Sequence, residues 1–298
     1  MIFPVSTREP DNRRAEPPVR PDGGRPLPEG PDTERDTERD TGRDTGRPDT
    51  GRSDTGRSDQ GHASVGPVEY VLPLVAHIEK DEPPARTAAL EAAARAVLVL
   101  LADERSTSPQ GPWHDAVRDW QDHRIRKVVR RARGSEWRKA GTLPGITVDH
   151  DGAEVRVYPP IPLDAWPKEL AKLQVSGTDL AEPATPAPAD PGRAVLWLNP
   201  ALEMTAGKAM AQVGHGAHIA WMRMGPAARA AWAERDFDLA VRTATPAAWP
   251  ALTTSGRPVV RDAGFTEIAP GSCTVVADVP WSRFRRGVGR APGSASNM

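Results

Sequence analysis

The chain has 298 residues, a formal net charge of −1 and a single cysteine. This length allows one or two domains, and 38% hydrophobic residues suffice for a substantial buried core. Because the charges nearly cancel, the net charge indicates no class of binding partner. A single cysteine excludes an internal disulfide framework and favours a reducing cytoplasm. The longest apolar run, 92–102, is interrupted by Arg95 and too short to span a bilayer, and no signal peptide is predicted.

Residues 1–66 are polar and nearly free of large apolar side chains. From Asp32 onward they repeat D-T-E-R and then D-T-G-R. Alternating Asp and Arg cancel in charge and bury nothing, so the segment cannot offset its ordering entropy. We predict a disordered, solvated tail, with a binding role for it as the alternative.

Residues 67–180 predict an α/β unit. Strands are expected at 68–75, 125–129, 146–148 and 155–158, and helices at 87–102, 112–120, 135–140 and 164–173. The following segment, 181–193, is rich in proline and is predicted to be a linker.

Residues 194–282 predict a second unit of the same kind. Its strands are expected at 194–198, 239–242, 259–260 and 273–277. Its helices are expected after Thr205, where the threonine is a plausible N-cap, and at 226–235 and 246–252. The remaining residues, 283–298, are Arg-rich and then Gly- and Ser-rich, and a basic, flexible tail is expected there.

The two units match each other in order and spacing. Trp120 and Trp137 stand the same number of residues apart as Trp232 and Trp249, and each pair brackets a short valine–arginine strand. The glycine-led strands 152–157 and 271–276 also correspond. We interpret 67–180 and 194–282 as two copies of one α/β unit of about 100 residues. Two unrelated segments with chance spacing are the alternative.

A polar stripe distinguishes the second copy. On the helix after Thr205, Lys208, Gln212 and His215 stand at i, i+4 and i+7 and share one face of an otherwise small and apolar helix. Lys208 lies in the first turn, where the helix dipole disfavours a cation. The first copy has R-T-A-A-L-E-A-A-A in the corresponding place and lacks the stripe. A solvated lysine, a surface amide and a buried core histidine are the alternatives.

A second motif, R-D-A-G-F-T-E-I-A-P-G-S, spans 261–272 between two short strands. Its D-A-G and P-G steps are turn signals, so we expect Asp262 and Thr266 at the edge of a sheet, facing the helix after Thr205. Residues that bond their own backbone in a turn are the alternative.

Together, G-K-A-M-A-Q-V-G-H-G-A and this loop resemble the peptidyl-tRNA hydrolases of the archaeal and eukaryotic class. That family carries G-K-x-x-A-Q-x-x-H-A and R-D-A-G-x-T-x-I-A-P-G-S/T; Gly216 here replaces the alanine after the histidine. The resemblance implies a small mixed sheet with helices on both faces. It also implies hydrolysis, by activated water, of the ester between a peptide and tRNA, without cofactor or metal. By matching position, the site residues are Lys208, Gln212, His215, Asp262 and Thr266.

These expectations define two functions. The first is a cytoplasmic peptidyl-tRNA hydrolase whose first copy is a degenerate partner, so that the two copies imitate a homodimer within one chain. The second is an inactive RNA-binding or adaptor protein on the same scaffold. Basic residues between Arg124 and Lys139, flanked by Trp120 and Trp137, are candidates for contact with tRNA. A solvated basic face is the alternative, and no membrane partner is expected.

Overall fold

The computed structural model describes residues 68–262 and 268–280. The predicted disordered tail, the basic tail and Thr266 lie outside the described residues. Among the described helices, none is both long and apolar enough to cross a membrane.

The first copy forms a mixed sheet with the strand order β2-β1-β4-β3. β1 runs parallel to β2 and antiparallel to β4, and a short β5 also pairs with β1. The strands are β1 Tyr70–His77, β2 Lys127–Ala132, β3 Ile146–His150, β4 Ala153–Val157 and β5 Ile161–Pro162. The helices are α1 Arg86–Ala102, α2 Glu104–Thr107, α3 His114–Asp122, α4 Gly134–Gly141 and α5 Lys168–Ala171.

The second copy repeats this topology in the order β7-β6-β9-β8. β6 is parallel to β7 and antiparallel to β9, which is antiparallel to β8. The strands are β6 Ala194–Leu198, β7 Leu239–Thr243, β8 Val259–Arg261 and β9 Cys273–Asp278. The helices are α6 Ala206–Arg223, α7 Pro226–Ala233 and α8 Trp249–Thr254.

Corresponding residues of the two copies have the same burial, hydrogen bonds and backbone conformation, in agreement with the predicted duplication. Trp120 and Trp232 are both fully buried. Each indole Nε1 donates to a backbone carbonyl just before the second strand, that of Arg126 at 2.9 Å and that of Asp238 at 3.1 Å. The turn glycines before β4 and β9 both adopt positive φ, 78° and 81°, a backbone conformation in which glycine is favoured. The α/β class with two tandem mixed sheets is confirmed.

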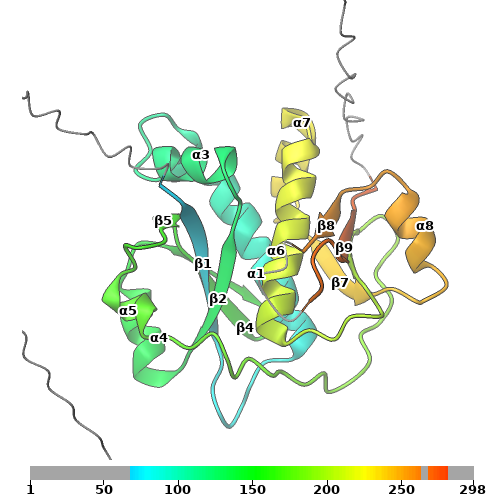
Figure 1. Cartoon of the computed structure of the whole chain (residues 1–298), viewed down its shortest axis with the longest axis horizontal. Helices are drawn as coiled ribbons and strands as arrows, with labels where there is room; N and C mark the ends of the chain where they lie inside the picture. Colours follow the sequence, from blue (N-terminus) through cyan, green and yellow to red (C-terminus); the bar gives the residue numbers. More distant parts are fainter. Residues whose placement is uncertain (1–67, 263–267, 281–298) are drawn as a thin grey trace, which may run out of the picture. The chain divides into compact units, whose positions relative to one another are not determined.

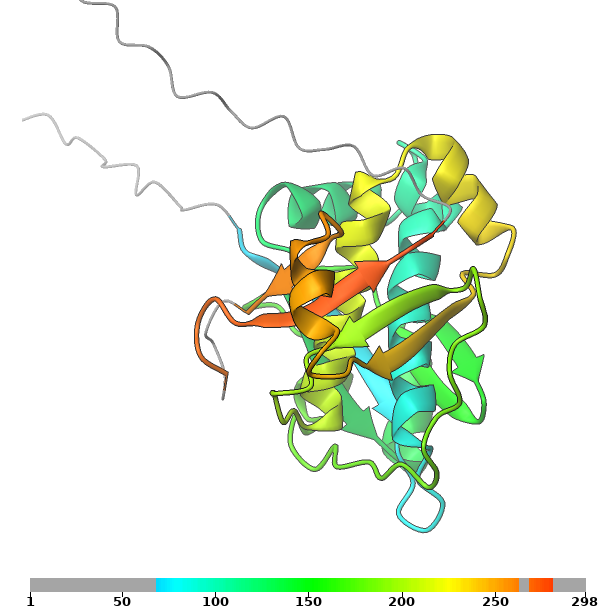
Figure 2. The ribbon, with the colours of Figure 1, turned by 90° about the vertical axis from the view of Figure 1, so that its right-hand side faces the viewer.

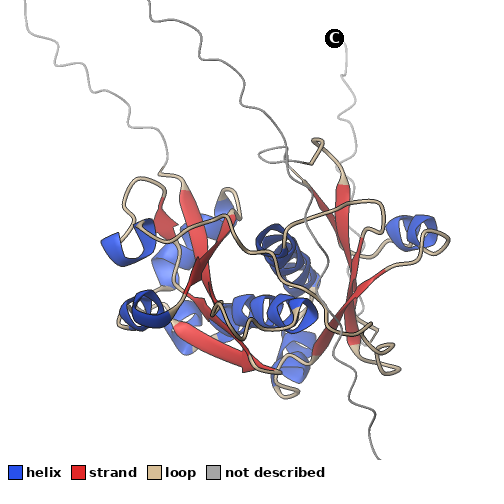
Figure 3. Ribbon diagram, turned by 90° about the horizontal axis from the view of Figure 1, so that it is seen from below, coloured by secondary structure: helices blue, strands red, loops and turns tan. Residues whose placement is uncertain are grey.

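The two copies share one hydrophobic core. Helices α1 and α6 lie side by side between the two sheets (Figures 1 and 3), and one cluster of buried apolar residues includes both helices and strands of both sheets. Figure 2 looks onto the second sheet with both helices behind it. A glycine makes the close approach possible: a Cβ on Gly214 of α6 would lie 3.2 Å from a methyl of Val97 in α1. Because α1 is apolar on nearly all sides, elements of both copies must pack against it to bury its surface.

The other face of the first sheet is covered by α4 and α5. A second, smaller cluster there contains Val75, Ala140, Tyr158 and Leu170. The predicted helix 164–173 is confined to α5, Lys168–Ala171. Pro167 explains the later start, because a residue that precedes proline is disfavoured in helical conformation.

The predicted linker, 181–193, has no helix or strand but is bonded to both copies: Arg242 Nε of β7 donates to the carbonyl of Ala187 at 2.7 Å, and two backbone N–H groups of α1 also donate to the linker. The N–H of Arg86 donates to the carbonyl of Ala181 at 3.0 Å, and the N–H of Thr87 donates to the Glu182 carboxylate at 2.8 Å. Residue 85, the N-cap position of α1, supplies no side-chain bond. The linker carboxylate therefore caps α1, where the helix dipole favours an anion.

Candidate active site

Helix α6 begins beyond the carboxyl end of β6. This end of the strands is the edge of the second sheet at which the site lies. Thr205 is its N-cap, as predicted, and its hydroxyl accepts from the N–H of Lys208 at 3.4 Å. A second hydroxyl comes from the segment that precedes the linker: Thr178 Oγ1 accepts from the N–H of Gly207 at 3.0 Å. These two bonds satisfy first-turn N–H groups that a helix leaves without intrahelical partners.

Lys208, Gln212 and Asp262 meet at this edge, as predicted. Lys208 Nζ lies 2.5 Å from Asp262 Oδ2, and the Gln212 amide donates to the same oxygen at 2.9 Å. The side chains of Lys208 and Asp262 are only 12% and 4% exposed. An ammonium and a carboxylate so far removed from water interact more strongly than a surface ion pair.

Thr274 of β9, which was not among the predicted site residues, completes the cluster. Its hydroxyl donates to Gln212 Oε1 at 2.5 Å, and the residue is fully buried. Because Gln212 Oε1 accepts there, its NH₂ group is turned to Asp262. A chain of bonds thus runs from Thr274 through Gln212 to Asp262. The available signal was one hydroxyl in the otherwise apolar run T-V-V-A.

The backbone on both sides of 263–267 holds Asp262 in place. Its N–H donates to the carbonyl of Ser272 at 2.9 Å, and its carbonyl accepts from the N–H of Gly271 at 2.8 Å. The register of β8 and β9 shifts between Val260 and Arg261. Such irregularities commonly re-aim a side chain beside a site.

The polar contact of His215 is made with the first copy. Its Nδ1 lies 3.4 Å from Nζ of Lys127 in β2, and the same Nζ lies 3.2 Å from Nδ1 of His218. His218 is fully buried and stacks on Trp120 at 4.7 Å. Burial lowers the pKa of His215 well below its usual value, and the charges of Lys127 and Lys208 lower it further. His215 therefore lies between the Lys208 cluster and the junction of the copies.

Lys127 was expected among residues that contact tRNA, but it is buried at the junction of the copies. Burial lowers the pKa of its amine well below the usual value. Other members of the basic run are engaged within the protein. Arg130 donates to the carbonyls of Ala171 and Leu173, and Arg131 donates to that of Ser176.

The basic residues beyond β2 differ from those within β2 in their exposure to solvent. Arg133, Arg138 and Lys139, at the start and in the second half of α4, are exposed. The predicted basic surface is therefore narrower than the sequence indicates. These three side chains and the exposed Arg124, whose Nη1 lies 3.8 Å from a Glu69 carboxylate oxygen, remain the candidates for contact with phosphate.

One group of possible metal ligands, Glu91, His150 and Asp151, occurs among the described residues. Glu91 already accepts from the N–H of Val241 at 2.8 Å, from Arg242 at 2.8 Å and from His150 at 2.7 Å. With a guanidinium on the carboxylate, this group is explained as an ion-pair network.

The comparisons with known proteins identify no relative. A scan against protein-family models finds no match, and a search of curated proteins finds no similar sequence. The family resemblance therefore stays a prediction.

Proposed function

We propose that this chain is a peptidyl-tRNA hydrolase, which splits the ester between tRNA and a peptide or N-blocked amino acid. One observation carries the proposal. The two segments that resemble the family, far apart in sequence, supply Lys208, Gln212 and Asp262 to one buried polar cluster at the edge of the sheet. Enclosed clusters of this kind commonly supply the acid, the base and the oxyanion-stabilising group that ester hydrolysis requires.

The chemistry requires an attacking water, a group that orients it and a group that stabilises the developing oxyanion. The water oxygen bonds to the ester carbonyl carbon, the bond from that carbon to the ribose oxygen breaks, and the water's proton ends on the ribose. Asp262 is suited to hold the water, because a carboxylate accepts hydrogen bonds. The Lys208 ammonium, at the positive end of α6, is suited to stabilise the oxyanion.

Gln212 and Thr274 act on the orientation of Asp262. The amide donates to the same carboxylate oxygen as Lys208, and the buried hydroxyl fixes which end of the amide does so. In this proposal Gln212 and Thr274 are positioning residues. Thr266 and His215 belong to the family's set; His215 lies close enough to Lys208 for its charge to affect the imidazole.

Release of peptide tests the proposal directly. We expect the full chain to release N-acetylated amino acid from N-acetylaminoacyl-tRNA, and Asp262→Asn and Lys208→Met each to lower the rate on the order of 100-fold or more. Exposed residues with the same changes, Asp179→Asn and Lys172→Met, are matched controls and retain the native rate.

Two outcomes would overturn the proposal. Equal rates in all five proteins would remove the site. Tight binding of the substrate by the native chain without any release would instead indicate the inactive RNA-binding or adaptor protein.

A further inference from the structure

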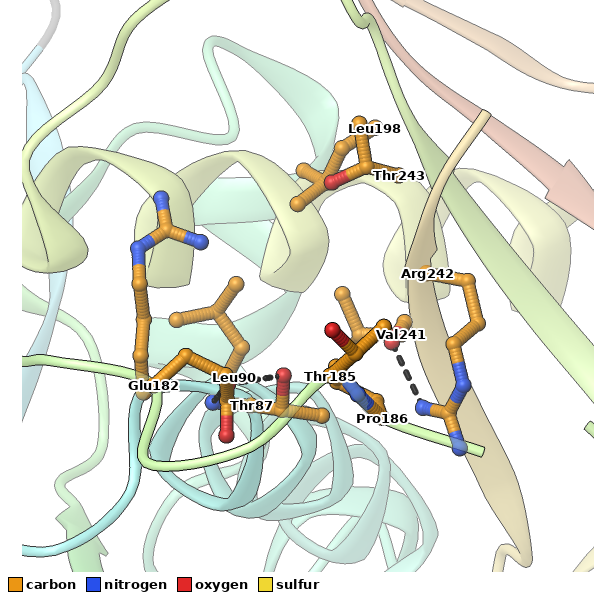
Figure 4. A pocket seen from close by; sticks show the side chains of 10 residues that line it. Thr87, Leu90, Glu182, Thr185, Pro186, Leu198, Val241, Arg242 and Thr243 are labelled. Atoms are coloured by element: carbon orange, nitrogen blue, oxygen red, sulfur yellow. Dashed lines mark hydrogen bonds between the residues drawn. The ribbon is translucent and has the colours of Figure 1, made fainter. Parts of the chain in front are cut away.

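A pocket of about 380 Å³ lies where the first copy, the linker and the second sheet meet (Figure 4). Its walls include Arg86 and Leu90 of α1, Glu182 of the linker, and Leu198, Arg242 and Thr243 at the carboxyl ends of β6 and β7. We call it the composite pocket. Its volume is at the lower end of the range for small-ligand sites, roughly 300–1,000 Å³. Ligands commonly bind beyond the carboxyl ends of parallel strands.

We propose that the composite pocket receives the peptide part of the substrate. This inference rests on the proposed hydrolase function and deepens it by naming what lies beyond the ester. It also assigns a function to the degenerate first copy. Helix α1 supplies one wall of the pocket, whereas hydrolysis takes place at the Lys208 cluster of the second copy.

The first argument is position. Leu198 of β6 pairs with Thr243 of β7 on one side and with Val275 of β9 on the other, and β8, which leads to Asp262, comes next. Two strand spacings of about 4.8 Å place the pocket's β6 wall roughly 10 Å from the strand that leads to Asp262. An extended peptide advances about 3.3–3.6 Å per residue, so about three residues bridge that distance.

The pocket and the cluster also lie on the same face of the sheet. Helix α1 contacts β7, and α6 contacts β8 and β9. Arg86 connects the two places, because its Nη2 donates at 3.1 Å to the carbonyl of Met204, just before α6. A chain that leaves the Lys208 cluster along this edge therefore enters the pocket beside α1.

The second argument is chemistry. Leu90, Leu198 and Val241 give the pocket apolar walls. Its charged groups are balanced: Glu182 lies near the Arg86 guanidinium, and Arg242 donates to Glu91 at 2.8 Å. Balanced donors and acceptors suit the neutral N–H and C=O groups of a peptide. A phosphate of the tRNA would require a net positive site.

Filling the pocket from its rim tests the inference. Thr185 and Thr243 are exposed lining residues, so Thr185→Trp and Thr243→Trp narrow the pocket without altering the core. Thr254→Trp, on the exposed side of α8, is the matched control. The assay compares kcat/KM on tRNA that carries N-acetylated chains of one, two and three residues.

We expect native protein and control to gain on the order of tenfold in kcat/KM from one residue to three, which corresponds to one or two hydrogen bonds. Either pocket variant loses this gain and retains the native rate on the one-residue substrate. An unchanged length dependence in both variants, with hydrolysis intact, overturns the pocket alone. If the native chain hydrolyses none of the substrates, the proposed function and the pocket inference both fail.

Discussion

At the junction of the copies, three basic side chains to which the described residues supply no carboxylate partner make stability sensitive to acid. Lys127 Nζ lies 3.4 Å from Nδ1 of His215 and 3.2 Å from Nδ1 of His218. Burial, followed by the charge of Lys127, lowers the pKa of both histidines well below the usual value. The charge of Arg229 also lowers the pKa of His218. We predict that the free energy of unfolding falls as the pH is lowered through 6.5.

The size of the loss follows from the unfolded state. An unfolded histidine binds a proton with a pKa of about 6.5, whereas the lowered pKa of both folded imidazoles keeps them neutral to lower pH, so the unfolded state gains protons first as the pH falls. From pH 7.5 to pH 5.5 this favours unfolding by at most about 1.4 kcal/mol for each histidine, and by at most roughly 2.8 kcal/mol for both. Above pH 6.5 the imidazoles are neutral in both states and add no pH-dependent cost, and the penalty on the folded state grows as the pH falls below 6.5.

Urea unfolding followed by tryptophan fluorescence at the two pH values measures this effect. His218→Leu removes one of the two groups, so its loss between pH 7.5 and pH 5.5 is expected to be smaller than that of the native chain, by at most about 1.4 kcal/mol. The exposed His123, changed to leucine, is the control and leaves the loss unaltered. If the native chain and His218→Leu lose equal stability, the reasoning is refuted.

Two further predictions concern the duplication and the site. Trp120→Phe and Trp232→Phe each remove an equivalent buried indole bond, and both are expected to cost roughly 1–3 kcal/mol by urea unfolding; a large cost for one and none for the other would contradict their equivalence. Thr274→Val removes the hydroxyl that orients Gln212, so kcat is expected to fall about tenfold while the protein stays folded by circular dichroism; a native kcat would show that the amide needs no such partner.

Local patterns in the sequence predicted much of the fold and part of the site. The helix after Thr205 begins as its capping residue indicates, and Lys208 and Gln212 share a face because they stand four residues apart. Asp262 follows a short strand and reaches that face, as the turn signals of its loop suggested. The equal spacing of the tryptophans reported a real equivalence for its first members, because the indoles of Trp120 and Trp232 donate to corresponding carbonyls before the second strand.

The remaining features depend on packing between distant segments. Lys127 belongs to a basic run, and its burial follows from the packing of α6 of the second copy against β2. Thr274 lies in an apolar strand, where sequence alone gives no partner for its hydroxyl. His215 shares the stripe of Lys208, yet its contact is with the first copy, because α6 lies between two sheets. The capping of α1 by Glu182 likewise requires the linker to fold back.

The central claim is that Lys208 and Asp262 form one hydrolytic unit, and a double-variant cycle tests it most directly. The single-turnover rate of release from N-acetylaminoacyl-tRNA is measured for the native chain, Lys208→Met, Asp262→Asn and the double variant. Groups that act as a unit are strongly non-additive. We predict that the double variant is no slower than the slower single variant, within about threefold. Losses that multiply, or single variants as fast as the native chain, would contradict the claim.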